Sequence, residues 1–183
     1  MTLRLRNTNK RYGAVSIWLH WSMAALIFAL FPVGIYMTGL PYVNPWYTTA
    51  PHLHKSFGII LLFLLILRTI WRRVNPKPEV EGPLWERISA RIVHASFYIL
   101  LFIITLNGYL IPTANGSPVE LFNWLKLPAI ISGIKGQGDV AGLIHYRAAV
   151  VLMALTALHI LAALKHHFID KDHTLKNMLG IKK

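Results

Sequence analysis

Four long apolar stretches, separated by polar segments, set the pattern of the chain. The first runs from Ala14 to about Thr38 without a charged residue, and the others cover about 52–71, 88–111 and 140–164. A helix of about 20 apolar residues crosses the hydrocarbon core of a bilayer. The pattern therefore predicts an all-α integral membrane four-helix bundle, built as a single domain over residues 1–183.

The connection over residues 112–139 is the longest polar segment between apolar stretches. Within it, Glu120, Asn123 and Lys126 recur at i, i+3 and i+6. Polar residues at this spacing share one face of a helix, while the apolar residues between them face the other way. The spacing predicts a short helix over about 119–127 that lies on the membrane surface.

Composition and charge fit this architecture and add an orientation. Charged residues make up 14% of the chain, against about one quarter in an average soluble domain. The net charge of +12 comes from residues that cluster between the apolar stretches, so we expect no nucleic-acid partner. Fifteen of the 19 Lys and Arg residues fall in 1–12, 68–91 and 165–183, and the positive-inside rule then places both termini in the cytoplasm.

The fourth stretch carries a histidine near each end, His145 and His159. In a helix, fourteen residues turn through about 1400°, roughly 40° short of four full turns, and rise about 21 Å. The two imidazoles therefore face nearly the same way at different depths. A histidine inside a membrane segment is costly, so a functional role is the first hypothesis for both.

Each of these histidines has a potential partner at its own depth. His20 matches His159 near the cytoplasmic side, and either His52 or His54 matches His145 at the outer side. Periodicity does not choose between His52 and His54. Haem iron takes two axial ligands, whereas zinc usually takes three or four, so the pairs favour two haems over zinc. The absence of cysteine excludes iron–sulfur clusters and covalent haem attachment through Cys-x-x-Cys-His. The alternative for each histidine is a hydrogen-bonded residue of the helix interface.

Three further polar residues are candidates with open alternatives. Arg68 could pair with a haem propionate or simply serve as a topology signal, and Arg147 could pair with a propionate or extend to the surface. His94 is not needed to complete either pair. A buried imidazole still needs a partner, which could be a neighbouring helix, a propionate or a quinone carbonyl.

Several motifs together resemble the bacterial cytochrome b561 family, small four-helix di-haem membrane cytochromes. They are Arg11-Tyr-Gly-Ala-Val-Ser-Ile-Trp-Leu-His20-Trp21, His54-Lys-Ser-Phe-Gly58, Arg68 with Pro76-x-Pro78, and the fourteen-residue spacing that ends in His159-Ile-Leu-Ala-Ala-Leu-Lys-His166-His167. The resemblance covers nearly the whole chain. It implies two non-covalent haem b groups held by His20, His54, His145 and His159, and it prefers His54 to His52. Gly58, one turn after His54, would leave room for a flat macrocycle.

The resemblance also implies a function and a location. It predicts a multi-pass oxidoreductase of the bacterial inner membrane that passes electrons from a periplasmic donor, superoxide in one branch of the family, to quinone. It identifies no catalytic side chain, and it does not extend to the 112–139 connection, which leaves the donor open. The alternatives are a haem-bearing membrane anchor for a dehydrogenase or hydrogenase partner, and a non-redox protein such as a small transporter.

Overall fold

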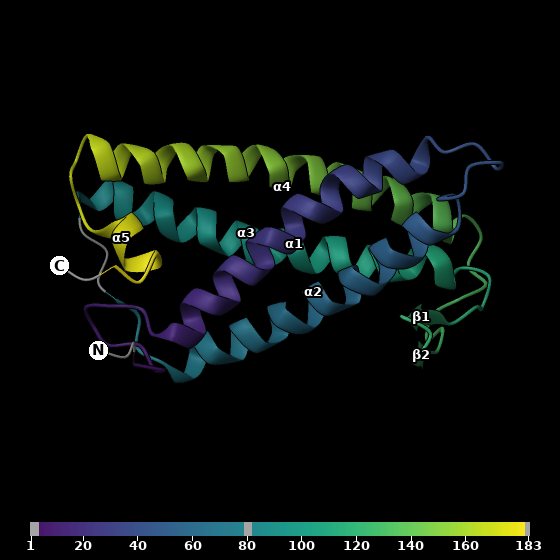
Figure 1. Ribbon diagram of the computed structural model, residues 1–183, viewed down its shortest axis with the longest axis horizontal. Helices are drawn as coiled ribbons and strands as arrows, with labels where there is room; N and C mark the ends of the chain where they lie inside the picture. The colour runs from purple at the N-terminus through teal and green to yellow at the C-terminus, as the bar shows by residue number, and fades with distance from the viewer. Residues whose placement is uncertain (1–3, 79–81, 182–183) are drawn as a thin grey trace.

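The computed structural model describes residues 4–78 and 82–181, and within them four helices are long and apolar enough to cross a membrane (Figure 1). Their bounds are α1 (Ala14–Thr38), α2 (Thr49–Val74), α3 (Leu84–Thr113) and α4 (Gln137–Phe168). At 1.5 Å per residue, even the 25 residues of α1 span about 37 Å, more than the roughly 30 Å of a hydrocarbon core. The predicted all-α membrane bundle is confirmed.

The four helices pack as two pairs. α1 packs against α2, α3 packs against α4 most closely of all, and α2 joins the pairs by packing against α3. Both ends of the chain lie at one end of the bundle (Figure 1), which we call the inner end. The opposite end, which carries the 39–48 loop and the 114–136 connection, is the outer end. A short helix, α5 (Thr174–Met178), follows α4 at the inner end.

A layer of buried apolar side chains fills the middle of the bundle. Each of the four long helices contributes to it: Leu19 and Met23, Leu61, Leu64 and Leu65, Leu101 and Ile104, and Ala148 and Leu152. Leu152 lies seven residues from both His145 and His159, so this layer separates the two depths at which the sequence places histidines. The outward faces expose large apolar side chains such as Trp18, Phe63 and Phe102, as expected for a surface that lipid covers.

The predicted surface helix over 119–127 is wrong. This segment forms an antiparallel hairpin of β1 (Val119–Leu121) and β2 (Leu125–Leu127) between Pro118 and Pro128. In the three-residue turn between the strands, Phe122 and Asn123 have left-handed φ values of 45° and 64°. The spacing that suggested a helical face instead places Glu120 opposite Lys126, with 2.9 Å between carboxylate and ammonium.

The hairpin is attached to the outer part of α2. The fully buried Ser56 hydroxyl accepts a hydrogen bond from the Phe122 amide at 3.1 Å and donates one to the Glu120 carbonyl at 3.4 Å. The ring of Phe122 also packs edge-on against Phe57, with 5.1 Å between the centroids. The hairpin is therefore fixed to α2 within one turn of His54.

Candidate functional site

At the outer end, α2 and α4 bring His54 and His145 together. The ring centroids are 6.1 Å apart and the ring planes are inclined by 70°. Both side chains are half-buried. His52 does not share this contact, since its side chain leaves α2 from another face, about 200° around the helix axis from that of His54.

The orientation of the His145 ring is set by a backbone carbonyl. Its Nδ1 lies 2.8 Å from the Ile104 oxygen, so Nδ1 carries the proton and donates it to α3. This arrangement leaves Nε2 unprotonated and free to bind a metal. Histidine ligands in metal sites usually have such a second partner, which fixes both tautomer and ring orientation.

Two glycines allow neighbouring helices to approach these rings. A Cβ added at Gly108 of α3 would lie 3.0 Å from Cε1 of His145, and one added at Gly34 of α1 would lie 3.1 Å from Cε1 of His54. A Cβ added at Gly58, by contrast, would meet nothing within 4 Å, so open space lies one turn after His54 among the described residues. Sequence analysis identified Gly58 and missed the other two. The sequence did contain a signal, because each is an isolated glycine inside a membrane helix. Such a glycine destabilises the helix by about 1 kcal/mol relative to alanine, so its presence indicates a close packing contact.

An apolar cavity of about 360 Å³ reaches His54 from the side of α1. Leu30, Val33, Trp46 and Phe57 contribute to its walls. Its size and apolar lining are typical of small-molecule and cofactor sites.

At the inner end, the structure gathers three histidines. His159 packs against His94, with 5.7 Å between centroids, and against Phe97 at 5.4 Å. His20 packs instead against its neighbour Trp21 at 5.1 Å, and its Nδ1 lies 3.1 Å from Nη1 of Arg68. His94, which sequence analysis set aside from both pairs, is therefore a direct neighbour of His159.

Arg68 has two partners at this end. Besides contacting His20, its Nε donates to the Tyr98 hydroxyl at 3.0 Å. Guanidinium can only donate, so His20 Nδ1 accepts and is unprotonated in this arrangement. Arg147 differs from Arg68. Its side chain is exposed, and it leaves α4 about 200° around the helix axis from that of His145. This placement favours the alternative in which Arg147 extends to the membrane surface.

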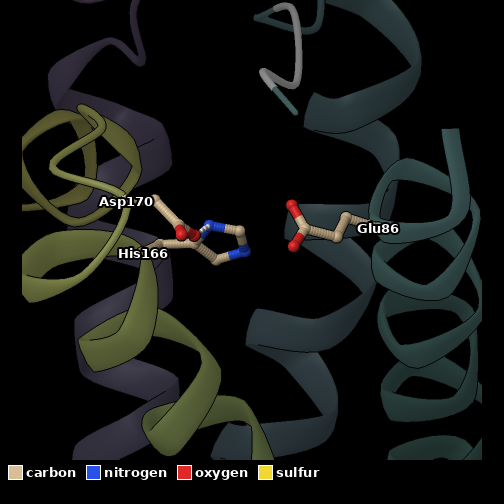
Figure 2. A group of neighbouring side chains, drawn as sticks. All are labelled: Glu86, His166 and Asp170. Carbon is tan, nitrogen blue, oxygen red and sulfur yellow. Dashed lines mark ion pairs between the residues drawn. The ribbon is translucent and has the colours of Figure 1, made fainter. Parts of the chain in front are cut away.

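A second polar cluster, at the inner end of the bundle, joins the start of α3 to the end of α4 (Figure 2). Candidate ligand atoms of Glu86, His166 and Asp170 all lie within 4.8 Å of one another. The Lys165 ammonium, however, lies 2.7 Å from both carboxylates, and it lowers the pKa of Asp170 by hydrogen bonding. We interpret the cluster as an ion-pair network whose cation is Lys165.

The amino-acid sequence matches a known family, described as prokaryotic cytochrome b561, over residues 11–180. The chain belongs to the prokaryotic cytochrome b561 family. It is 44% identical over 179 residues to cytochrome b561 homolog 2 of Escherichia coli (strain K12), across 95% of this chain and 94% of that protein. It is 27% identical over 180 residues to the probable superoxide oxidase CybB of Yersinia pestis, across 96% and 99% of the two chains. It is also 26% identical over 176 residues to cytochrome b561 homolog 1 of Escherichia coli (strain K12), across 94% and 99%.

Membership of the cytochrome b561 family confirms the resemblance and identifies a membrane haem electron-transfer protein. The outer histidines fit the haem b that the family implies. A metal–imidazole bond of about 2 Å on each side, plus roughly 1 Å from each nitrogen to its ring centroid, separates two axial rings by about 6 Å. His54 and His145 are 6.1 Å apart. The buried Nδ1 of His54 has no hydrogen-bond partner among the described residues.

Proposed function

We propose that the protein is a di-haem b-type cytochrome that transfers electrons across the bacterial inner membrane, between a periplasmic donor and the quinone pool. The observation that carries the proposal is the presence of two histidine groups at opposite ends of one bundle, both anchored on α4 and separated by a layer of buried apolar side chains. Bound at these groups, haem b would supply a one-electron couple on each side of the membrane.

At the outer end, His54 and His145 are the proposed axial ligands. The Ile104 carbonyl holds the His145 ring, and Gly34 and Gly108 give both rings room. His52 is not proposed as a ligand because the ring that contacts His145 is that of His54.

At the inner end, His20 and His159 are the proposed ligands, although His94 is the ring in contact with His159. The reason lies in the packing of the helices. His94 and His159 face one another across α3 and α4, the most closely packed pair, and a flat macrocycle between them would force these helices apart. α1 and α4 belong to different pairs, so a macrocycle held between His20 and His159 would not have to separate two closely packed helices.

Arg68 is the proposed partner of an inner haem propionate. An imidazole that binds iron through Nε2 carries its proton on Nδ1, and it then no longer accepts from Arg68. Haem binding would thus release the guanidinium from His20, and the planar guanidinium is suited to a carboxylate. The Tyr98 hydroxyl keeps it at the inner end.

The proposed orientation places both termini in the cytoplasm. Its support is the distribution of Lys and Arg, fifteen in the three inner segments and four elsewhere. The described parts of those three segments lie at one end of the bundle (Figure 1).

The proposed donor is a small periplasmic reductant, with superoxide as the first candidate. One relative is named a probable superoxide oxidase. The outer positive charges are Lys55, Lys126, Lys135 and Arg147, and they would attract an anion. Lys126 contributes less, because Glu120 already neutralises it at 2.9 Å. Quinone is the proposed acceptor, and His94, which lies beside His159, is its proposed contact.

A second candidate function is a membrane anchor for a soluble dehydrogenase or hydrogenase. The outer connection exposes Trp124 and Ile130 to 88% and 82%, which is unusual for large apolar side chains and would suit a docking surface. An anchor would need its partner for turnover, whereas the proposed cytochrome acts alone.

The test is a reduced-minus-oxidised spectrum of the purified chain with a haem count, followed by quinone reduction assays. We expect two six-coordinate low-spin b haems per chain, and superoxide-dependent quinone reduction without a partner. A count near one, or rapid carbon monoxide binding to both haems, would contradict the di-haem assignment. Two haems without activity would favour the anchor.

A further inference from the structure

The segment after α4 folds back and links the two helix pairs at the inner end. α5 contacts α4, and the indole Nε1 of Trp21 on α1 donates a hydrogen bond of 2.9 Å to the Met178 carbonyl in α5 (Figure 1). α1 otherwise packs chiefly against α2, and α4 chiefly against α3. α5 thus bridges the two helices that carry His20 and His159.

The turn that leads into α5 is held by the ion-pair network around Lys165, of which Figure 2 shows Glu86, His166 and Asp170. Lys165 joins Asp170 to Glu86 at the start of α3, with 2.7 Å to each carboxylate. His166 Nδ1 lies 2.9 Å from Asp170 and 3.1 Å from Asp172. Asp172 in turn accepts from the Thr174 amide at 2.9 Å, which fixes the first residue of α5. The segment therefore has a polar attachment to α3 and a separate attachment to Trp21.

Trp21 also contacts the histidine that precedes it. Its ring stands edge-on to His20, with 5.1 Å between centroids and 73° between planes. One end of the indole is fixed by its hydrogen bond to Met178, and the indole ring limits how the imidazole of His20 can turn. Trp18, one turn earlier on α1, is 59% exposed and offers a tryptophan on the same helix for comparison.

We propose that Trp21 is a positioning residue of the inner haem site: it couples α5 to the imidazole of His20 and so sets the orientation of that ligand. The inference rests on the proposed function, because it takes His20 and His159 as the inner axial pair. It adds a role for the C-terminal segment, which joins α1 to α4 at the inner end and would orient His20 for binding a haem iron.

The test compares Trp21→Phe with Trp18→Phe in the full chain loaded with haem. Phenylalanine keeps an aromatic ring beside His20 but removes the hydrogen bond to Met178. We expect two haems in each protein. In Trp21→Phe alone, the electron paramagnetic resonance signal of the inner haem should shift, because that signal depends on the angle between the two imidazole planes. Carbon monoxide should also bind the reduced inner haem about tenfold faster, as expected when one hydrogen bond that restrains a ligand is lost.

A second readout does not depend on haem. Trypsin cleavage after Lys176, within α5, should be faster in Trp21→Phe than in the wild type or Trp18→Phe. Glu86→Gln, which weakens the other attachment, should produce a smaller change of the same kind, and it serves as the test variant should Trp21→Phe fail to fold. Faster cleavage with an unchanged inner signal would overturn the positioning role, as would equal effects of Trp18→Phe. If the wild-type protein itself carried no inner haem, by contrast, the proposed function would be overturned.

Discussion

His145 and His20 differ in what their Nδ1 atoms contact, and this distinguishes the two ends of the bundle. At the outer end, the Ile104 carbonyl accepts from His145 Nδ1, so Nε2 is already in the state that binds iron. At the inner end, Arg68 donates to His20 Nδ1, and the proton must move to Nδ1 before Nε2 can bind. In the proposed function, the His145 ring would therefore need no change of tautomer to bind haem, whereas the His20 ring would have to change its tautomer.

The loss of an axial ligand tests this comparison with the largest effect. We expect His54→Ala and His145→Ala to remove the outer haem, and His20→Ala and His159→Ala to remove the inner one, so that each count falls from two to one. The measurement is the haem-to-protein ratio with a spectrum that identifies the remaining haem. His52→Ala is the matched control and should keep both haems; if it lost the outer haem while His54→Ala kept it, the outer assignment would be wrong.

Replacing a glycine that contacts a histidine ring should weaken haem binding at the outer site only. In Gly108→Ala the new methyl would lie 3.0 Å from the His145 ring, so the ring must move and its bond to Ile104 is strained. Overpacking of this kind costs about 1–3 kcal/mol, so outer haem affinity should fall about tenfold. The measurement is haem loss on heating or dilution, followed separately for each haem.

Gly142→Ala is the control for this prediction, because a Cβ there meets nothing within 4 Å among the described residues. Equal losses in the two variants would mean that the glycine at position 108 does not serve the His145 ring.

Removing the Arg68 charge should affect only the inner site. We expect Arg68→Gln to lower the inner haem potential by tens of millivolts, because an interaction of about 1 kcal/mol corresponds to roughly 40 mV for a one-electron couple. Arg68→Lys should recover part of the shift, since it restores the charge but not the planar guanidinium. Redox titration of both haems gives the measurement, and a shift of the outer potential of equal size would contradict the assignment of Arg68 to the inner site.

The smallest structural effect is expected for His94→Gln. Because His20 and His159 are the proposed inner ligands, both haems should stay in place. A quinone contact would then appear as slower quinone reduction with an unchanged haem spectrum, since imidazole can donate a hydrogen bond or a proton near neutral pH. Unchanged kinetics would remove His94 from the quinone site, and loss of the inner haem would show that the role of His94 is structural.

Sequence alone predicted the features that depend on local periodicity. The four helices follow from the length of the apolar stretches. The common face of His145 and His159 follows from the 3.6-residue repeat of a helix. The hairpin was missed because Glu120 and Lys126 are separated by a spacing that suits a helical face as well as a cross-strand pair. The left-handed turn at Phe122 and Asn123 decided between them, and only Asn123 is a residue typical of that conformation.

The contacts that shape the candidate site depend on how the helices pair, which periodicity does not encode. The contact between His94 and His159 exists because α3 and α4 pack closely, and the roles of Gly34 and Gly108 depend on helices other than those that carry the histidines. The attachment of Trp21 to Met178 joins residues 157 positions apart. Each of these contacts could be identified only from the tertiary arrangement of the helices.

The apolar layer between the two sites has an electrical consequence. Hydroxyl groups near this level, Thr105 and Thr156, donate to carbonyls of their own helices, so they offer no chain of donors and acceptors along which protons could follow an electron. In the proposed orientation, an electron that crosses inward moves negative charge toward the negative side of an energised membrane. That step requires work of about 2.3 kcal/mol per 100 mV. The difference in potential between donor and quinone must therefore exceed the voltage across the membrane, and an increase in that voltage should slow turnover from the periplasmic side.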